Sequence, residues 1–311
     1  MKFKVITSSL LVLAVVTSSF LGCSNKNVSS NSSNTVNYAN EMKKYTIGEY
    51  GYLDSYVKSN NIELNTFSDK DKVLKVLNEL NSEKNMVYLT TDSHLLSEDN
   101  YKVTKEQSNI IYCGEIKDNK PNGIGAIFEV KDGKNFIKYV GNFKKGIFEG
   151  YGMLFNVPTD DEFYYANIIY NNDEDKAIKR SNYLVFDGEF EDGQANGKGN
   201  YYVYLNLQTE MYLVQDGKPK STDIGIYVGK FEIDNNGITG EGKEYQSGYL
   251  YYDGEFKNSS FNGDGILYFE KSKQKEYEGS FRNGKYNGKG TLYDETGKVI
   301  YSGKWDMGDY K

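Results

Sequence analysis

The stretch that decides the fold reads Tyr252-Asp253-Gly254-Glu255-Phe256 and, after six more residues, Gly263-Asp264-Gly265. Alternate side chains of a strand point to the same face, so Tyr252, Gly254 and Phe256 share one face. The residues after Phe256 provide a turn, and the Gly-x-Gly pair opens a second strand with a bare backbone. The stretch therefore predicts a β-hairpin that cannot bury its rings alone. We expect a ring from the neighbouring unit to fill the slot that the glycine leaves.

The same pattern recurs from Tyr112 to the end of the sequence, with starts 24 to 47 residues apart. Six units carry a Gly-x-Gly pair, a seventh is truncated, and in the unit at Tyr227 the pair is displaced by two residues. Stacking such hairpins buries the rings in a continuous core. The residues that define the repeat are Tyr112, Gly114, Gly123, Gly125, Tyr139, Gly141, Phe143, Gly150, Gly152, Phe186, Gly188, Phe190, Gly197, Gly199, Tyr227, Gly229, Phe231, Gly240, Gly242, Tyr252, Gly254, Phe256, Gly263, Gly265, Tyr277, Gly279, Phe281, Gly288, Gly290, Tyr301, Gly303 and Trp305.

The two longest intervals between starts have room for a degenerate or inserted unit. Two aromatic-rich segments, Phe163 to Tyr170 and Tyr201 to Leu213, are the candidates. The acidic segment from Asn171 to Asp175 lies between them, and we expect it to be an exposed loop.

These residues resemble the MORN repeat (membrane occupation and recognition nexus) over about residues 111–311, nearly two-thirds of the chain. The resemblance implies a mainly β fold, an elongated and curved antiparallel hairpin solenoid. It also implies an assembly and interaction module that is not an enzyme through its repeats and needs no cofactor. Some members of the family have been proposed to bind phospholipid headgroups.

The first residues have the features of an export signal. Lys2 and Lys4 are followed by an apolar stretch that ends at Leu21-Gly22-Cys23. This end resembles the lipobox of bacterial lipoproteins, with Phe20 where an aliphatic residue is usual. We therefore expect residues 1–22 to be a lipoprotein signal peptide and Cys23 to carry a diacylglyceryl and acyl lipid. Residues 23–45 would be a flexible Ser/Asn tether. The alternative is an ordinary cleaved signal with a chance cysteine.

This signal predicts attachment to the extracytoplasmic face of a bacterial cell membrane. Two acyl chains give stable anchoring where one gives only marginal binding. Among the 37 basic residues only Arg180 and Arg282 are arginine, which indicates an AT-rich genome and favours a Gram-positive host.

Residues 46–110 predict a small α+β segment. Ser68 fits the N-cap of a helix with acidic residues in its first turn. Residues 86–90 predict a short strand, and Gly48 to Tyr52 could be strand or loop. His94 is the single histidine, so neither a zinc site nor a His-based triad can be assembled.

Charge and motifs exclude several functions. The net charge of −7 excludes a general nucleic-acid binder. From residue 112 onward there are 25 basic and 32 acidic residues, an acidic balance that disfavours an anionic membrane as a ligand of the repeats. Lys271, Lys273 and Lys275 form the one basic run. No phosphate loop, nucleophile elbow or paired metal motif is present. The segment from Asp234 to Gly237 lacks the ligand spacing of a calcium loop and predicts a turn.

Two functions remain. The first is a non-catalytic scaffold that binds an unknown protein partner or self-associates through the open edge of its last hairpin. The alternative is a cell-wall glycan binder, in which exposed tyrosine rows stack on sugar rings. The tyrosines of these rows are Tyr201, Tyr202, Tyr204, Tyr249 and Tyr251.

Overall fold

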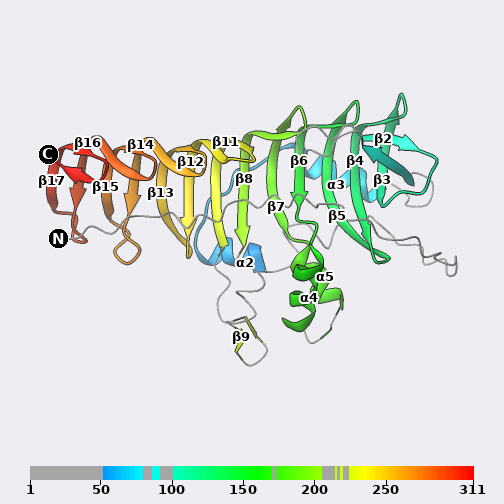
Figure 1. Cartoon of the computed structure of the whole chain (residues 1–311), viewed down its shortest axis with the longest axis horizontal. Coiled ribbons are helices and arrows are strands. Elements are labelled where there is room, and N and C mark those ends of the chain that lie inside the picture. The colour runs from blue at the N-terminus through cyan, green and yellow to red at the C-terminus, as the bar shows by residue number, and fades with distance from the viewer. Residues whose placement is uncertain are drawn as a thin grey trace.

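The fold is one long antiparallel sheet of sixteen strands (Figure 1), described here from a computed structural model of the chain. From β3 onward each strand of the sheet pairs with the next strand of the sheet in chain order, while β1 lies between β2 and β3. The structure describes residues 52–79, 86–91, 101–169, 172, 174–204, 214–215, 218–219 and 224–311. The predicted elongated solenoid of stacked hairpins is confirmed.

The strands of the sheet are β1 (Met86–Thr91), β2 (Tyr101–Thr104), β3 (Ile110–Lys117), β4 (Lys120–Lys131), β5 (Lys134–Lys144), β6 (Ile147–Phe155), β7 (Leu184–Glu191), β8 (Gln194–Tyr204), β11 (Ile224–Asp234), β12 (Gly237–Gln246), β13 (Tyr249–Lys257), β14 (Ser260–Tyr268), β15 (Lys275–Arg282), β16 (Lys285–Tyr293), β17 (Val299–Asp306) and β18 (Asp309–Tyr310). The remaining elements are the ribbon of β9 (Val214–Gln215) and β10 (Lys218–Pro219) and the helices α2 (Tyr52–Ser59), α3 (Asp69–Glu79), α4 (Asp160–Ile169) and α5 (Glu174–Ser181).

A row of glycines crosses the sheet from β3 to β17, each opposite the next. The members of this glycine row are Gly114, Gly125, Gly141, Gly152, Gly188, Gly199, Gly229, Gly242, Gly254, Gly265, Gly279, Gly290 and Gly303. Because glycine has no side chain, the row is a trough in which aromatic rings lie.

The ring that fills the trough comes from the unit's own first residue. A Cβ added to Gly254 or Gly265 would overlap the ring of Tyr252, which is fully buried. This ring stacks on Phe261 with centroids 3.9 Å apart. The sequence had predicted a ring from the neighbouring unit, and that prediction is wrong. The ring of the same unit can fill the trough because the tyrosine side chain leans along its strand and covers the glycine two residues further on.

The hydroxyl of this tyrosine explains why the first position is usually tyrosine. Tyr252 Oη donates a hydrogen bond to the carbonyl oxygen of Glu255, three residues ahead, at 3.0 Å. The buried hydroxyl is thus satisfied within its own unit. The same bond recurs from Tyr112 to Glu115 (2.8 Å), from Tyr139 to Asn142 (3.0 Å), from Tyr277 to Ser280 (3.1 Å) and from Tyr301 to Lys304 (3.2 Å).

The first glycine of the Gly-x-Gly pair has a different role. In the β13–β14 hairpin the register shifts between Gly254 and Phe256, and Gly263 adopts a φ of 60°. Such a bulge leaves extra residues on one strand and favours glycine at a positive φ. The β11–β12 hairpin has no register shift in nine consecutive pairs, which accounts for its displaced Gly-x-Gly pair. There the ring of Phe231, instead of Tyr227, lies against Gly229 and Gly242.

A helical insertion separates β6 from β7. The segment from Phe163 to Tyr170 was a candidate for a degenerate or inserted unit. Residues 163–169 form most of α4, so they belong to a helical insertion and not to a degenerate repeat. Thr159 Oγ1 accepts a hydrogen bond from the Glu162 amide while the Thr159 amide donates to the Glu162 carboxylate, a reciprocal cap that starts a helix. Asn182 anchors the insertion, because its side chain pairs with both backbone groups of Ile137.

The other predicted segments have mixed outcomes. Asn172 is an exposed turn residue as expected, but Glu174 already belongs to α5. Residues 201–204 extend β8, and residues 205–213 lie outside the described part of the chain. The turn that was expected at Asp234 to Gly237 is confirmed.

The elements before the repeats join the same structure. The helix expected after Ser68 is α3, with Asp69 and Asp71 in its first turn, and the expected strand is β1. Tyr52 begins α2, where a strand or loop had been expected. Strand β1 pairs with β3 and so belongs to the sheet.

The packing of the trough gives a test. The substitution Gly265→Ala should lower the free energy of unfolding by at least about 2 kcal/mol, because the new methyl group overlaps Tyr252. Gly225→Ala is the matched control, since its Cβ would lie 3.5 Å from Val203, an ordinary contact. Urea unfolding of both variants measures the difference. Equal stabilities would contradict the described role of the trough.

Candidate interaction surface

The sheet buries side chains on both of its faces. One face holds the rings over the glycine row together with residues such as Phe143, Phe256 and Trp305, and we call it the ladder face. On the opposite face, buried residues including Val140, Met153 and Ile226 pack with residues 52–79. We call residues 52–79 the strap and this second face the strap face.

The strap crosses the sheet as a helix, an extended segment and a second helix. In Figure 1 it runs behind the strands, from α2 near β8 and β11 to α3 near β4 to β6. Leu53, Ile62 and Val73 are its buried apolar residues. Tyr56 Oη also donates to the carbonyl oxygen of Ile224 at 3.2 Å.

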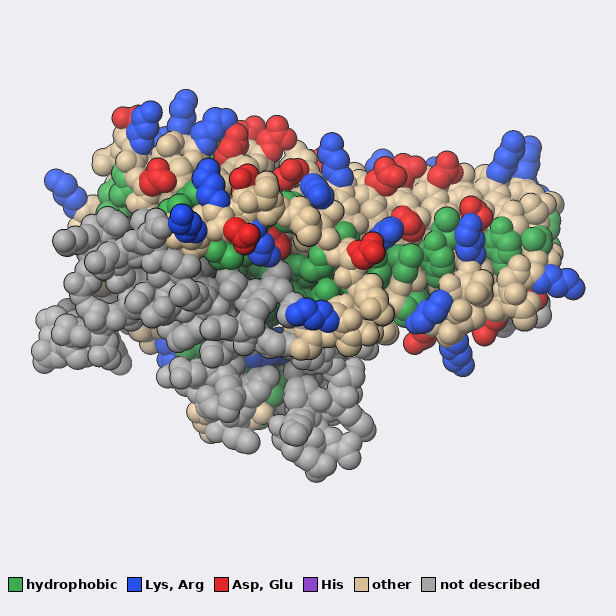
Figure 2. All heavy atoms as spheres, turned by 180° about the vertical axis from the view of Figure 1, so that it is seen from behind, with side chains coloured by type: hydrophobic (Ala, Val, Ile, Leu, Met, Phe, Trp, Pro, Cys, Tyr) green, Lys and Arg blue, Asp and Glu red, His purple; other side chains and the backbone are tan. Residues whose placement is uncertain are grey.

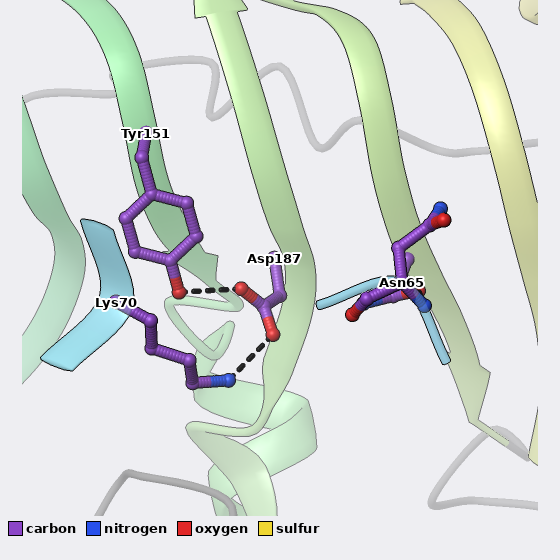
Figure 3. A network of polar contacts seen from close by, with 5 residues as sticks. Asn65, Lys70, Tyr151 and Asp187 are labelled. Carbon is purple, nitrogen blue, oxygen red and sulfur yellow. Dashed lines mark hydrogen bonds and ion pairs between the residues drawn. The ribbon is translucent and has the colours of Figure 1, made fainter. Parts of the chain in front are cut away.

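Two polar networks fix the strap in register, and Figure 3 shows the one around Asp187. Asn65 and Asn200 form two hydrogen bonds: the Asn65 amide donates to Asn200 Oδ1 at 2.8 Å, and Asn200 Nδ2 donates to the Asn65 carbonyl at 3.0 Å. Lys70 Nζ lies 2.6 Å from Asp187 Oδ2, and Tyr151 Oη donates to Asp187 Oδ1 at 2.6 Å. Asp187 is 2% exposed, so these partners compensate a buried charge.

One register row runs across the strap face and shows where the strap ends. Its members lie opposite one another on successive strands, and we call it the cover row. They are Cys113, Ala126, Val140, Met153, Asp187, Asn200, Val228, Lys243, Asp253, Ile266, Glu278, Thr291 and Ser302. Every member from Cys113 to Val228 is buried, and every member from Lys243 to Ser302 is half-buried or exposed.

Beyond Val228 the strap face is amphipathic and charged. Glu278 forms an ion pair with Lys275 at 2.9 Å and accepts a hydrogen bond from Tyr293 Oη at 3.3 Å. Figure 2 shows the side opposite to the view of Figure 1, where hydrophobic side chains form a band toward the β17 end, bordered by acidic and basic residues. This half of the face is the candidate interaction surface.

The irregular hairpin places a carboxyl group inside the sheet. Glu244 is 2% exposed and accepts hydrogen bonds from Tyr227 Oη at 2.9 Å and from Gln246 Nε2. Burial raises the pKa of Glu244 to about 7, although both hydrogen bonds act in the opposite direction. The tyrosine that leaves the trough in this unit has therefore taken a buried carboxyl group as its partner.

The repeat-defining residues are structural in this arrangement. Their glycines form the trough and the bulges, and their rings form the core of the ladder face. Cys113 is a free, buried cysteine, and burial raises the pKa of its thiol. Cys23 and His94 lie outside the described residues.

The tyrosines that had been expected in exposed rows are not exposed. Tyr201, Tyr202 and Tyr249 are buried, and Tyr204 and Tyr251 are half-buried. The Lys273 ammonium group lies 4.0 Å from the centroid of the Tyr249 ring. Because these rings already pack against the protein, the basis for sugar stacking is lost.

The sequence analysis missed Asn65, Lys70, Asp187, Asn200 and Glu244. The second position of most units is apolar or acidic and changes along the array, but the repeat pattern alone does not show which of these residues meets the strap. Within the described segments no group of three potential ligands is placed to hold a metal ion. No helix in the same segments is long and apolar enough to cross a membrane.

Comparison with known families agrees with this geometry. Segments 112–126, 139–155, 186–202, 252–272 and 277–299 match the model of the MORN repeat. Five segments of the chain thus match this repeat model. The match omits the unit at Tyr227, in which Tyr227 does not fill the trough, and the truncated last unit. No curated protein matches the chain. MORN repeats indicate a role in protein interaction or membrane binding.

The buried ion pair gives a second test. Lys70→Met should lower the free energy of unfolding by about 3 kcal/mol, because it leaves the Asp187 carboxylate buried without a cation. Lys75→Met, at an exposed position of the same helix, is the control. Hydrogen exchange of strap amides should accelerate only in the first variant. Unchanged protection would show that the ion pair does not hold the strap.

Glu244 gives a prediction on pH. Its pKa is raised in the folded state, so folding favours the protonated form and stability falls as pH rises from about 4.5 to about 7. Glu244→Gln should therefore stabilise the protein by up to about 3 kcal/mol at pH 8 and by nearly nothing at pH 4. Urea unfolding at both pH values measures this, with the exposed Glu241→Gln as control. A gain that does not depend on pH would contradict the assignment.

Proposed function

We propose that the chain is a membrane-anchored extracytoplasmic lipoprotein whose MORN-repeat sheet is a non-catalytic protein-interaction scaffold. The lipobox-like segment that ends at Cys23 supports the anchor, and the half of the strap face beyond Val228, which the strap does not cover, carries the scaffold role. A surface of half-buried apolar side chains among charges of both signs is suited to a polypeptide partner.

The edge strand β17 supports association through the backbone as well. Strand β18 pairs with Trp305 and Asp306 only, so most of β17 has one unpaired edge in the described structure. Large exposed apolar side chains cluster at this end, namely Val299, Ile300, Met307 and Tyr310. Such an edge is a site for pairing with another strand, including that of a second copy.

The opposite end of the sheet is closed. The amide of Tyr101 donates to the carbonyl of Gly146 at 3.0 Å, and that of Val103 donates to the carbonyl of Asn119 at 2.8 Å. Edge strand β2 is therefore blunted by turns of the array, and we assign edge-to-edge association to β17.

The charge of the array favours a protein partner over a lipid surface. The array is acidic, and an anionic leaflet attracts basic clusters. In this proposal the acyl chains on Cys23 hold the membrane and leave the array free for other partners. Cell-wall glycan remains the second candidate ligand, but the buried tyrosines do not favour it.

The anchor has a direct test. Cys23→Ser should move the protein from the membrane fraction to the medium, because it removes both acyl chains. Fractionation of cells that express either form measures the shift. A serine variant that stays in the membrane would refute the lipid anchor.

The scaffold role is tested by crosslinking on intact cells, followed by mass spectrometry of what is retained with the acylated protein. A recurrent protein partner, or a second copy of the chain, is the expected result. Muropeptides without any protein would favour the glycan alternative.

A further inference from the structure

The strap shows what chemistry the strap face recognises. Its extended residues lie across β8 and β11, where Asn65 Nδ2 donates to the carbonyls of Gly199 at 2.8 Å and of Gly229 at 3.1 Å. Both acceptors belong to the glycine row. The face therefore binds a polypeptide segment through backbone carbonyls and through the cover-row side chains Asp187 and Asn200.

The cover row continues beyond the strap with the same register. Asp187 occupies the second position of its unit and binds Lys70 of the strap. Asp253 occupies that second position two units later, and it is only half-buried. Within the segments that the structure describes, Asp253 accepts no hydrogen bond and forms no ion pair, whereas Glu278 is paired with Lys275.

Apolar surface adjoins this carboxylate. Ile266 lies directly opposite Asp253 on the neighbouring strand and is also half-buried. Adjacent strands are about 4.8 Å apart, and an extended chain rises about 3.3 Å per residue. One segment can thus place a cation on Asp253 and an apolar side chain on Ile266 one or two residues away.

We infer that the strap face of β13 to β16 binds an extended polypeptide segment of a second protein, with a lysine or arginine on Asp253 and an apolar side chain on Ile266. The inference rests on the protein-interaction role proposed above and names its surface and the chemistry of its partner. Continuity with the strap interface and the acidic charge at Asp253 carry it. An anionic lipid headgroup would meet Asp253 with the same sign of charge.

A peptide screen tests this inference on the full chain in detergent. The probe is an array of random 12-residue peptides. The wild-type protein should enrich peptides in which a basic residue stands one or two positions from an apolar one. Asp253→Lys should weaken binding of a selected peptide at least tenfold and shift enrichment to Asp- or Glu-containing peptides. Asp253→Asn should weaken binding without that shift.

A control separates local recognition from net charge. Asp309→Lys makes the same change of charge at an exposed residue of β18 and should leave peptide binding within twofold. Circular dichroism of each variant checks that the sheet is intact. Equal binding by wild type and Asp253→Lys would overturn the inference, as would a dimer that Asp253→Lys dissociates.

The peptide screen tests the assigned surface and the crosslinking experiment tests the scaffold role, so a negative result in one does not imply a negative result in the other. If crosslinking finds a protein partner but the array enriches no basic peptide, the scaffold role stands and the assigned surface is wrong. If crosslinking finds muropeptides alone, the scaffold role itself is overturned.

Discussion

The structure depends on a ring that lies over two glycines. In each regular unit one aromatic ring, usually a tyrosine and in one unit Phe186, covers a glycine of its own strand and a glycine of the partner strand. On the ladder face the buried cluster consists of strand residues alone, so its rings must be buried along the sheet itself. The trough makes this possible, because the rings lie flat and stack on the next aromatic residue, as Tyr139 does on Phe148 at 3.8 Å. Any side chain in the trough would force the rings out.

The sequence predicted this face of the sheet well, and its reasons are local. The alternation of rings and glycine fixes which residues share a face, and the spacing of the Gly-x-Gly pair fixes the hairpin. Alternation alone could not predict which ring covers each glycine, because the same unit and the neighbouring unit both offer one. The insertion at α4 was readable, since Thr159 and Glu162 have the spacing of a capping box. Its aromatic residues were instead interpreted as a degenerate or inserted unit.

The strap face was not predictable from the repeat, because the repeat pattern fixes only the ring and glycine positions and leaves the residues on the strap face free to vary. The second residue of a unit is Val140 in one unit, Asp187 in another and Asp253 in a third. Only the contacts of the strap give these differences a meaning. Asp187 is buried because Lys70, more than a hundred positions earlier in the chain, reaches it. Such a pair between distant segments leaves no periodic signal in a single sequence.

The two faces of the sheet therefore have different constraints. The ladder face is constrained at every full unit, because a ring must coincide with two glycines. The strap face tolerates any residue that suits what lies upon it. Where the strap covers it, the cover row is apolar or is paired with a strap residue. Where the strap ends, the row changes from buried to half-buried or exposed within a single strand, at Lys243. The residues of the cover row can thus differ from strand to strand, while the trough that holds the strands together stays the same.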